Sequence, residues 1–178
     1  MKKGKNAFYT LGVATAICAF AFCGGIAKGG KNVVASADTL QSYSTRTAIT
    51  AQGENGFYYA WGKPDKYVLM TYGAISGGGY SWRAIEPYAT INGSALHPGN
   101  YYGVMVVWVA PESGTVQLTG SMDKGTKNGD GVNLGVYHQK YGGTLSTLFE
   151  KLVAADGELK NTLDQSVTVS KGDTLLFY

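Results

Sequence analysis

The sequence predicts an all-β domain built as an antiparallel β-sandwich, and three observations lead to that prediction. Short apolar runs recur through residues 49–178, and several of them alternate with polar residues. Turn residues separate these runs, and the chain contains 26 glycines, about twice the usual share. No pattern long enough for an extended helix follows residue 48. A closed barrel is the alternative architecture for the same pattern.

The run 103–110 is the strongest predicted strand. It is apolar on both faces, which indicates a central strand and places Trp108 in the core. In the next run, Val116 and Leu118 alternate with polar residues and are expected to face inward. Further strands are predicted at 57–61, 67–72, around Trp82 and Ile85, and at 132–136, 167–169 and 175–177.

One segment has an ambiguous pattern. Its apolar residues Leu145, Leu148, Phe149 and Leu152 are spaced as i, i+3, i+4 and i+7, which is the spacing of one helical face. The segment is therefore predicted to form one short helix, or a loop followed by a weak strand at 148–154.

The first 37 residues are predicted to be a secretory signal peptide with a helical apolar part. Three lysines lie within the first five residues, an uncharged run follows at 7–27, and Ala35-Ser36-Ala37 provides a small-residue cleavage site. The apolar run is also long enough to span a bilayer, so an uncleaved anchor is an alternative. A lipid anchor on Cys23 is a second alternative. The predicted location is therefore outside a bacterial cell, either secreted or at the cell surface, with membrane contact only through this segment if it is uncleaved.

The predicted organisation is a signal peptide at 1–37, a polar linker at 38–48 and one β-sandwich domain at 49–178. The signal segment contains five lysines and no acidic residue, so 10 basic and 12 acidic residues remain after cleavage and the net charge becomes −2. Without a basic surface, nucleic acid is not expected as a partner. Both cysteines also lie in the signal, which excludes a disulfide or a thiolate nucleophile in the domain.

A series of short motifs runs through the predicted domain. In order, these are Asn55-Gly56-Phe57-Tyr58-Tyr59, Tyr67-x-x-Met70-Thr71, Trp82, His97-Pro98-Gly99, Trp108-Val109-Ala110-Pro111-x-x-Gly114-Thr115-Val116, Gly120, Gly129-Asp130-Gly131-Val132 and Val169-x-x-Gly172-Asp173. The series resembles the non-catalytic jelly-roll modules of secreted bacterial carbohydrate-active and cell-surface proteins. The resemblance implies a jelly-roll sandwich that binds carbohydrate. Such modules usually continue into one further strand and are attached to a larger polypeptide or cell-surface assembly, so we expect the last strand to be missing here.

Clustered aromatic residues carry the functional prediction, because sugars stack their C–H faces on aromatic rings. The predicted partner is a poly- or oligosaccharide. Tyr101 and its neighbour Tyr102 should point in opposite directions in an extended segment, so only one of them would serve a site. Trp61 is expected on either face with equal weight, and Trp82 is expected to be partly exposed. The predicted site uses Trp61, Tyr80, Trp82 and Tyr101 for stacking, with Arg83 and His97 for polar contacts.

The sequence does not predict an enzyme. Glycoside hydrolysis needs two carboxylates across a cleft, and the available acids Glu54, Glu86, Asp123 and Asp130 lie in no recognisable constellation. The chain contains no Gly-x-Ser-x-Gly, no His-Glu-x-x-His and no phosphate-binding loop. Its two histidines, His97 and His138, are far apart in the sequence.

No cofactor is predicted, and a structural calcium ion is the alternative. Asp123, Asn128 and Asp130 share one polar loop, and oxygen ligands suit this hard cation. The spacing matches no EF-hand loop, and the same residues are ordinary turn formers.

A second hypothesis treats the chain as a structural or protein-interaction accessory domain of a cell-surface assembly. In that case the same aromatic residues would form a protein interface. An open sheet edge would favour this hypothesis, because such an edge recruits a strand from a partner.

Overall fold

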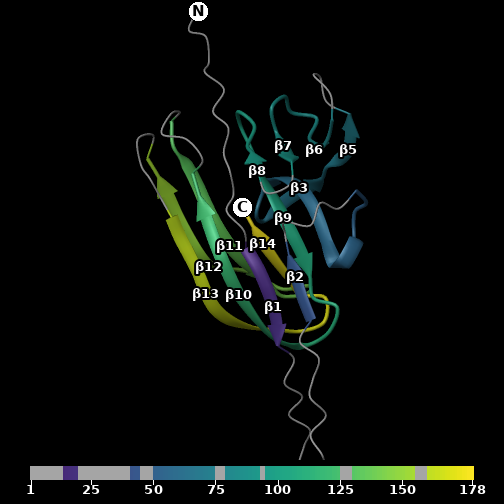
Figure 1. The fold of residues 1–178 in the computed structure, drawn as a ribbon, viewed down its shortest axis with the longest axis vertical. Coiled ribbons are helices and arrows are strands. Elements are labelled where there is room, and N and C mark those ends of the chain that lie inside the picture. The colour runs from purple at the N-terminus through teal and green to yellow at the C-terminus, as the bar shows by residue number, and fades with distance from the viewer. Residues whose placement is uncertain are drawn as a thin grey trace, which may run out of the picture.

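The computed structural model describes residues 14–19, 41–44, 50–74, 79–92, 95–124, 130–154 and 160–178. Apart from one turn of 3-10 helix at Glu54–Gly56, the regular elements in these ranges are β-strands. The strands form three open sheets in which the pairings are antiparallel (Figure 1). The predicted all-β antiparallel fold is therefore confirmed, and the described strands do not close into a barrel.

The largest sheet, sheet B, has six strands. In spatial order they are β12 (Leu145–Val153), β11 (Val132–Gln139), β14 (Thr174–Phe177), β9 (Gly103–Val109), β3 (Phe57–Lys63) and β4 (Lys66–Leu69). The predicted strand at 103–110 is β9, and it lies inside the sheet between β14 and β3. This position explains why its residues are apolar on both faces.

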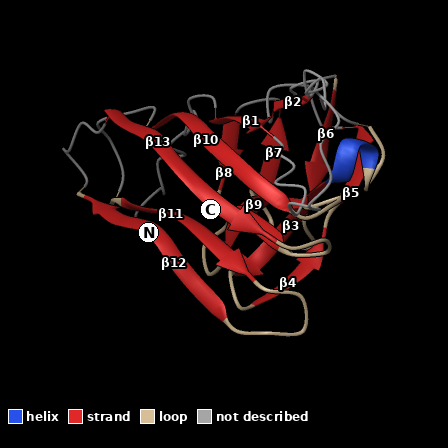
Figure 2. Ribbon diagram, turned by 90° about the horizontal axis from the view of Figure 1, so that it is seen from below, coloured by secondary structure: helices blue, strands red, loops and turns tan. Residues whose placement is uncertain are grey.

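Sheet A packs against sheet B as a second layer, as the views in Figures 1 and 2 show. Its strands are β13 (Lys160–Val169), β10 (Gly114–Asp123), β1 (Ala14–Ala19) and β2 (Gln41–Ser44). The third sheet, sheet C, lies at one end of the molecule, at the top of Figure 1. Its strands are β5 (Thr71–Ala74), β6 (Tyr80–Arg83), β7 (Thr90–Asn92) and β8 (Ala95–His97).

The main core lies between these layers. Trp108 is fully buried, as predicted, and Val116 and Leu118 are the inward-facing residues of β10. Sheet C adds Trp82 and Ile91 to the same core, so the three sheets share one apolar interior. Burial of these side chains is the dominant stabilising contribution.

Sheet B has a second, smaller apolar cluster on its outer face. The cluster is buried and consists of Ala60, Met105, Val107, Tyr137 and Leu176. Several tyrosine rings pack against it, and the ring of Tyr178 lies over Gly103, where an added Cβ would come within 2.3 Å of it. Burial, with a smaller contribution from Glu150, raises the pKa of Tyr137 to about 12.

The helical alternative for residues 145–152 is wrong, because this segment is strand β12. β12 pairs with β11, and the register shifts at Val136/Tyr137, where Leu148 is the extra residue. The bulge places Leu148 and Phe149 against the main core, while Leu145 packs on the outer cluster. Apolar residues on two different faces of the sheet therefore produce the sequence spacing that is typical of one helical face.

The predicted strand at 67–72 is also divided. It breaks at Met70, which separates β4 in sheet B from β5 in sheet C. Met70 is buried but Val68 is exposed, so these alternate residues of the predicted strand do not share one buried face.

Of the predicted signal segment, the structure describes only residues 14–19. They form β1, which pairs antiparallel with β10 from Ala14↔Gly120 to Ala19↔Thr115. The predicted cleavage site lies outside the described residues, and of the predicted linker only β2 is described. Within the ranges given above, no helix has the length and apolar character needed to cross a membrane.

Candidate functional site

Two surface loops meet beside sheet C. Loop 84–89 joins β6 to β7, and loop 98–102 joins β8 to β9. The carboxylate of Glu86 connects them, because its Oε1 accepts the Tyr101 N–H at 2.8 Å. Gly99 lies so close to this carboxylate that an added Cβ would be 2.3 Å from the Glu86 Cδ. Glu86 and Gly99 therefore fit together as a latch, and a side chain at position 99 would displace it.

Each loop is also closed by its own backbone hydrogen bonds. Ala84 N–H donates to the Ala89 carbonyl at 3.0 Å, and Gly99 N–H donates to the Tyr102 carbonyl at 2.9 Å. Between the ends of the first loop, Tyr88 has a φ of 74°, a left-handed conformation that non-glycine residues rarely adopt. Such strain costs about 1–3 kcal/mol and is concentrated at functional sites.

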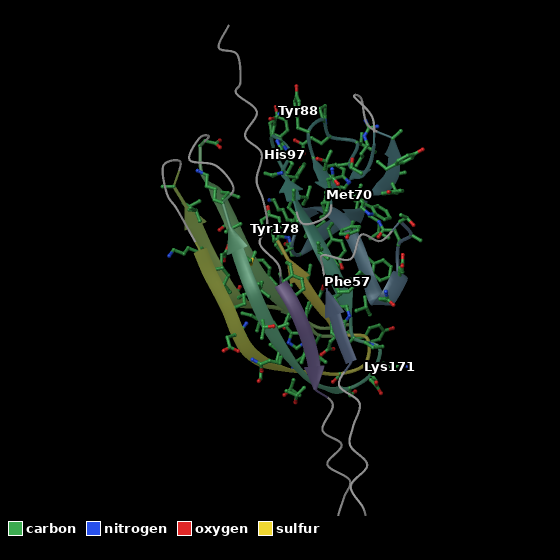
Figure 3. All side chains as sticks on the ribbon, in the orientation of Figure 1. Phe57, Met70, Tyr88, His97, Lys171 and Tyr178 are labelled. Carbon is green, nitrogen blue, oxygen red and sulfur yellow. The ribbon has the colours of Figure 1, made fainter. Side chains whose placement is uncertain are left out.

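The two loops present a group of exposed apolar side chains, here called the loop platform: Ile85, Tyr88, Tyr101 and Tyr102. Tyr101 is the most exposed of its rings, at 84%. Figure 3 shows Tyr88 at the same end of the molecule as His97. Exposed aromatic rings on loops held by a rigid sheet are typical of binding surfaces.

Trp61 packs between the main core and the platform residue Tyr102. It lies on β3, is half-buried against the main core, and contacts Tyr102 edge-to-face with ring centroids 5.8 Å apart. This arrangement is a favourable one for two aromatic rings. Of the predicted stacking residues, Trp61 thus contacts the platform through Tyr102, and Tyr101 precedes Tyr102 in loop 98–102.

Tyr80 and Trp82 belong to a different row of rings. The row runs from Tyr59 to Trp82 (5.0 Å), from Trp82 to Tyr72 (5.3 Å) and from Tyr72 to Tyr80 (5.7 Å). Tyr80 is 61% exposed at the outer end, but Trp82 is only 4% exposed. The expectation that Trp82 is partly exposed is therefore wrong, because sheet C folds its inner face onto Tyr59 and the main core.

The two predicted polar residues make local hydrogen bonds. Arg83 is exposed, and its Nη1 donates to the Ala74 carbonyl at 2.9 Å. His97 is half-buried, and its Nδ1 lies 2.9 Å from the Pro98 carbonyl. Because a carbonyl only accepts, Nδ1 carries the proton in this contact. His97 thus helps to fix the start of loop 98–102.

Replacing Glu86 by alanine should loosen the latch. We expect hydrogen exchange of the Tyr101 amide to accelerate and the free energy of unfolding to fall by about 1 kcal/mol, since one hydrogen bond to a charged acceptor is lost. Glu86→Gln is the control, because it keeps an acceptor oxygen at the same reach. Equal exchange rates of this amide in the alanine variant and the unchanged protein would contradict a latch.

A buried pair of hydrogen-bonded side chains lies away from the platform. His138 Nε2 is 2.9 Å from Asp173 Oδ2, and both side chains are buried. Asp173 also accepts the N–H groups of Ser170 and Tyr141 at 2.9 Å each. The arrangement closes the turn between β13 and β14 and ties it to β11, so we assign it a structural role.

The described part of the chain does not group the other acidic residues that were considered for catalysis or calcium binding. Glu54 and Asp130 are exposed, while Asn128 and the side chain of Asp123 lie outside the described part of the chain. Among the described residues, no three His, Cys, Asp or Glu side chains are grouped as a metal site. The predicted calcium loop stays a prediction.

Comparison with protein families, with curated proteins and with solved structures finds no match for this chain. Fold and site together define a class: an all-β antiparallel sandwich with an aromatic platform on two latched loops. The expectation that Ile85 belongs to a strand with Trp82 is wrong, because β6 ends at Arg83 and Ile85 lies exposed in loop 84–89. Sequence reasoning also missed Tyr88 and the role of Glu86. The available signal for Tyr88 was its position directly after Pro87, since an aromatic residue in a turn is often exposed.

Proposed function

We propose that this protein is an exported, non-catalytic carbohydrate-binding module that holds glycan on the loop platform. The observation that carries the proposal is the exposure of three tyrosine rings on two loops that Glu86 connects. A ring held in place loses little conformational entropy when it stacks on a sugar, so a latched platform favours binding.

The proposal changes the expected contact residues, and it uses both Tyr101 and Tyr102, since both are exposed, where only one of them was expected to serve a site. Tyr101, Tyr102 and Tyr88 would provide the stacking surface, and Trp61 would support it from below. Tyr80 is exposed at the end of the second row of rings and would be an additional subsite. Trp82 would act only by supporting that row.

Tyr101→Ala is expected to weaken glycan retention about tenfold while leaving stability nearly unchanged. The lost stacking is worth about 1–2 kcal/mol, and an exposed ring contributes little to the core. The measurement is retention on cellulose, xylan, chitin and starch, together with Trp fluorescence, because Trp61 contacts Tyr102.

Tyr141→Ala is the matched control, since Tyr141 is 82% exposed but lies beside the turn that contains Gly172. We expect its retention to equal that of the unchanged protein. Equal losses in both variants, or no retention of the folded protein on any of the four polysaccharides, would contradict a platform that binds glycan.

A further inference from the structure

Strand β10 has a partner along each of its edges. β13 pairs along one edge over the whole length of β10, and β1 pairs along the other. β1 belongs to the predicted signal segment. We propose that, once residues 1–37 are removed, this second edge of β10 accepts an extended strand from another polypeptide.

The core needs a strand at this place. Val116 and Leu118 of β10 are fully buried, and they face the inner residues of a six-stranded sheet. Without β1, the paired strands that remain in sheet A are β13 and β10. Two strands at about 4.8 Å spacing are too narrow to cover the inner face of the six-stranded sheet B. The edge would also present a row of unpaired N–H and C=O groups, which is a template for strand addition.

The register of β1 defines the chemistry of the partner. Ala16 stands opposite Leu118, and Cys18 stands opposite Val116. Both are small and uncharged, as a position beside the core requires. The partner would therefore be an extended segment of at least about six residues, antiparallel to β10, with small apolar residues at alternate positions.

The edge itself lacks the usual protection against such pairing. Residues 114–122 of β10 contain no charged side chain, whereas exposed edge strands commonly carry lysine or proline. Among the described strands, β4 shows the contrast, since it is short and begins with Lys66. An unguarded edge next to a core is the property expected of a strand acceptor.

Two other occupants fit less well. β2 is polar, with the sequence Gln-Ser-Tyr-Ser, and would bury hydroxyl groups opposite Leu118. A second copy that paired through its own β10 would bring its six-stranded sheet B beneath the same edge. Because sheet B is wider than the two strands left in sheet A, the two sheets B would overlap. An unfolded, extended segment avoids both problems.

The test uses the full chain with a protease site inserted between Ala37 and Asp38, cut after folding. The probe is a peptide with the Ala14–Ala19 sequence, carrying Cys18→Ala and flanked by lysine pairs. The control peptide carries Ala16→Asp in addition. Hydrogen exchange of β10 amides is measured before the cut, after separation of residues 1–37, and after addition of each peptide.

We expect the amides of β10 that face β1 to exchange on the order of 100-fold faster after separation, because they become unpaired. The amides that face β13 serve as an internal reference and should stay slow. The probe should restore protection and the control peptide should not. Retention of residues 1–37 after the cut, or refolding of an unfolded cut chain by the probe alone, would equally support a strand acceptor.

Three results would overturn the proposal. Unchanged protection in a monomeric cut chain from which residues 1–37 have been separated would mean that a segment of the same chain fills the edge. Protection that grows with protein concentration would assign the edge to a second copy. The fluorescence of the buried Trp108 reports whether the cut chain is folded. If the probe neither restores protection to a folded cut chain nor refolds an unfolded one, the edge accepts no strand. None of these results depends on glycan binding.

Discussion

Trp82→Ala is expected to lower the free energy of unfolding by about 3–5 kcal/mol, which is the cost of removing a buried tryptophan. Trp82 contacts Tyr59 on one side and Tyr72 on the other, with ring centroids 5.0 and 5.3 Å away. Its loss would leave a cavity between sheet C and the main core. Chemical denaturation followed by circular dichroism measures the change.

Tyr80→Ala is the control for this prediction. Tyr80 lies at the exposed end of the same row, where its ring stacks on Tyr72. Its replacement should cost less than about 1 kcal/mol. A similar stability loss in both variants would show that the row acts as one packed unit whose outer ring matters as much as its centre.

The stability effect of Trp82 also determines how binding data should be interpreted. If Trp82→Ala lowers glycan retention, the loss can come from partial unfolding of sheet C, so retention must be compared at equal fractions of folded protein. Tyr101→Ala does not have this problem, since that ring is outside the core. The contrast between the two variants separates a supporting ring from a contacting ring.

Alternation of residues predicted the sheets well where one face of a strand meets the core. Val116 and Leu118 are inward as expected, and Trp108 is buried because β9 is covered on both faces. These outcomes follow from local pattern alone, since each side chain on a strand has only two directions to choose from.

Failures arose where long-range pairing changed the local pattern. The bulge at Leu148 needs the partner strand β11 to be known, so β12 was confused with a helix. Burial of Trp82 depends on the interruption of the strand at Met70, after which the chain continues into the strands of sheet C. The latch between Glu86 and Gly99 depends on how β6, β7 and β8 fold back on one another, and no spacing rule contains that information.

Asp173→Asn is expected to lower the free energy of unfolding at pH 7 by about 1–3 kcal/mol, the usual cost of leaving a buried hydrogen-bond donor without its acceptor. The three hydrogen bonds to Asp173 come from Ser170 N–H, Tyr141 N–H and His138 Nε2. A carboxylate accepts all three, whereas an asparagine amide must direct its NH2 group at one of these donors. Asp164→Asn, an exposed carboxylate that pairs with Gln117, is the control and should cost less than about 1 kcal/mol.

The same residue predicts the acid limb of the stability curve. Burial alone raises the pKa of Asp173, but the hydrogen bonds from Ser170, Tyr141 and His138 outweigh it and hold this pKa below its ordinary value. A depressed folded-state pKa means that the stabilisation is present above the unfolded-state value, about 3.9, and is lost as pH falls through the folded-state value. The unchanged protein should therefore lose stability steeply below about pH 4, and Asp173→Asn should show a shallower slope there. If denaturation midpoints of the two proteins fall in parallel between pH 5 and pH 2, the carboxylate of Asp173 is not what makes the fold acid-sensitive.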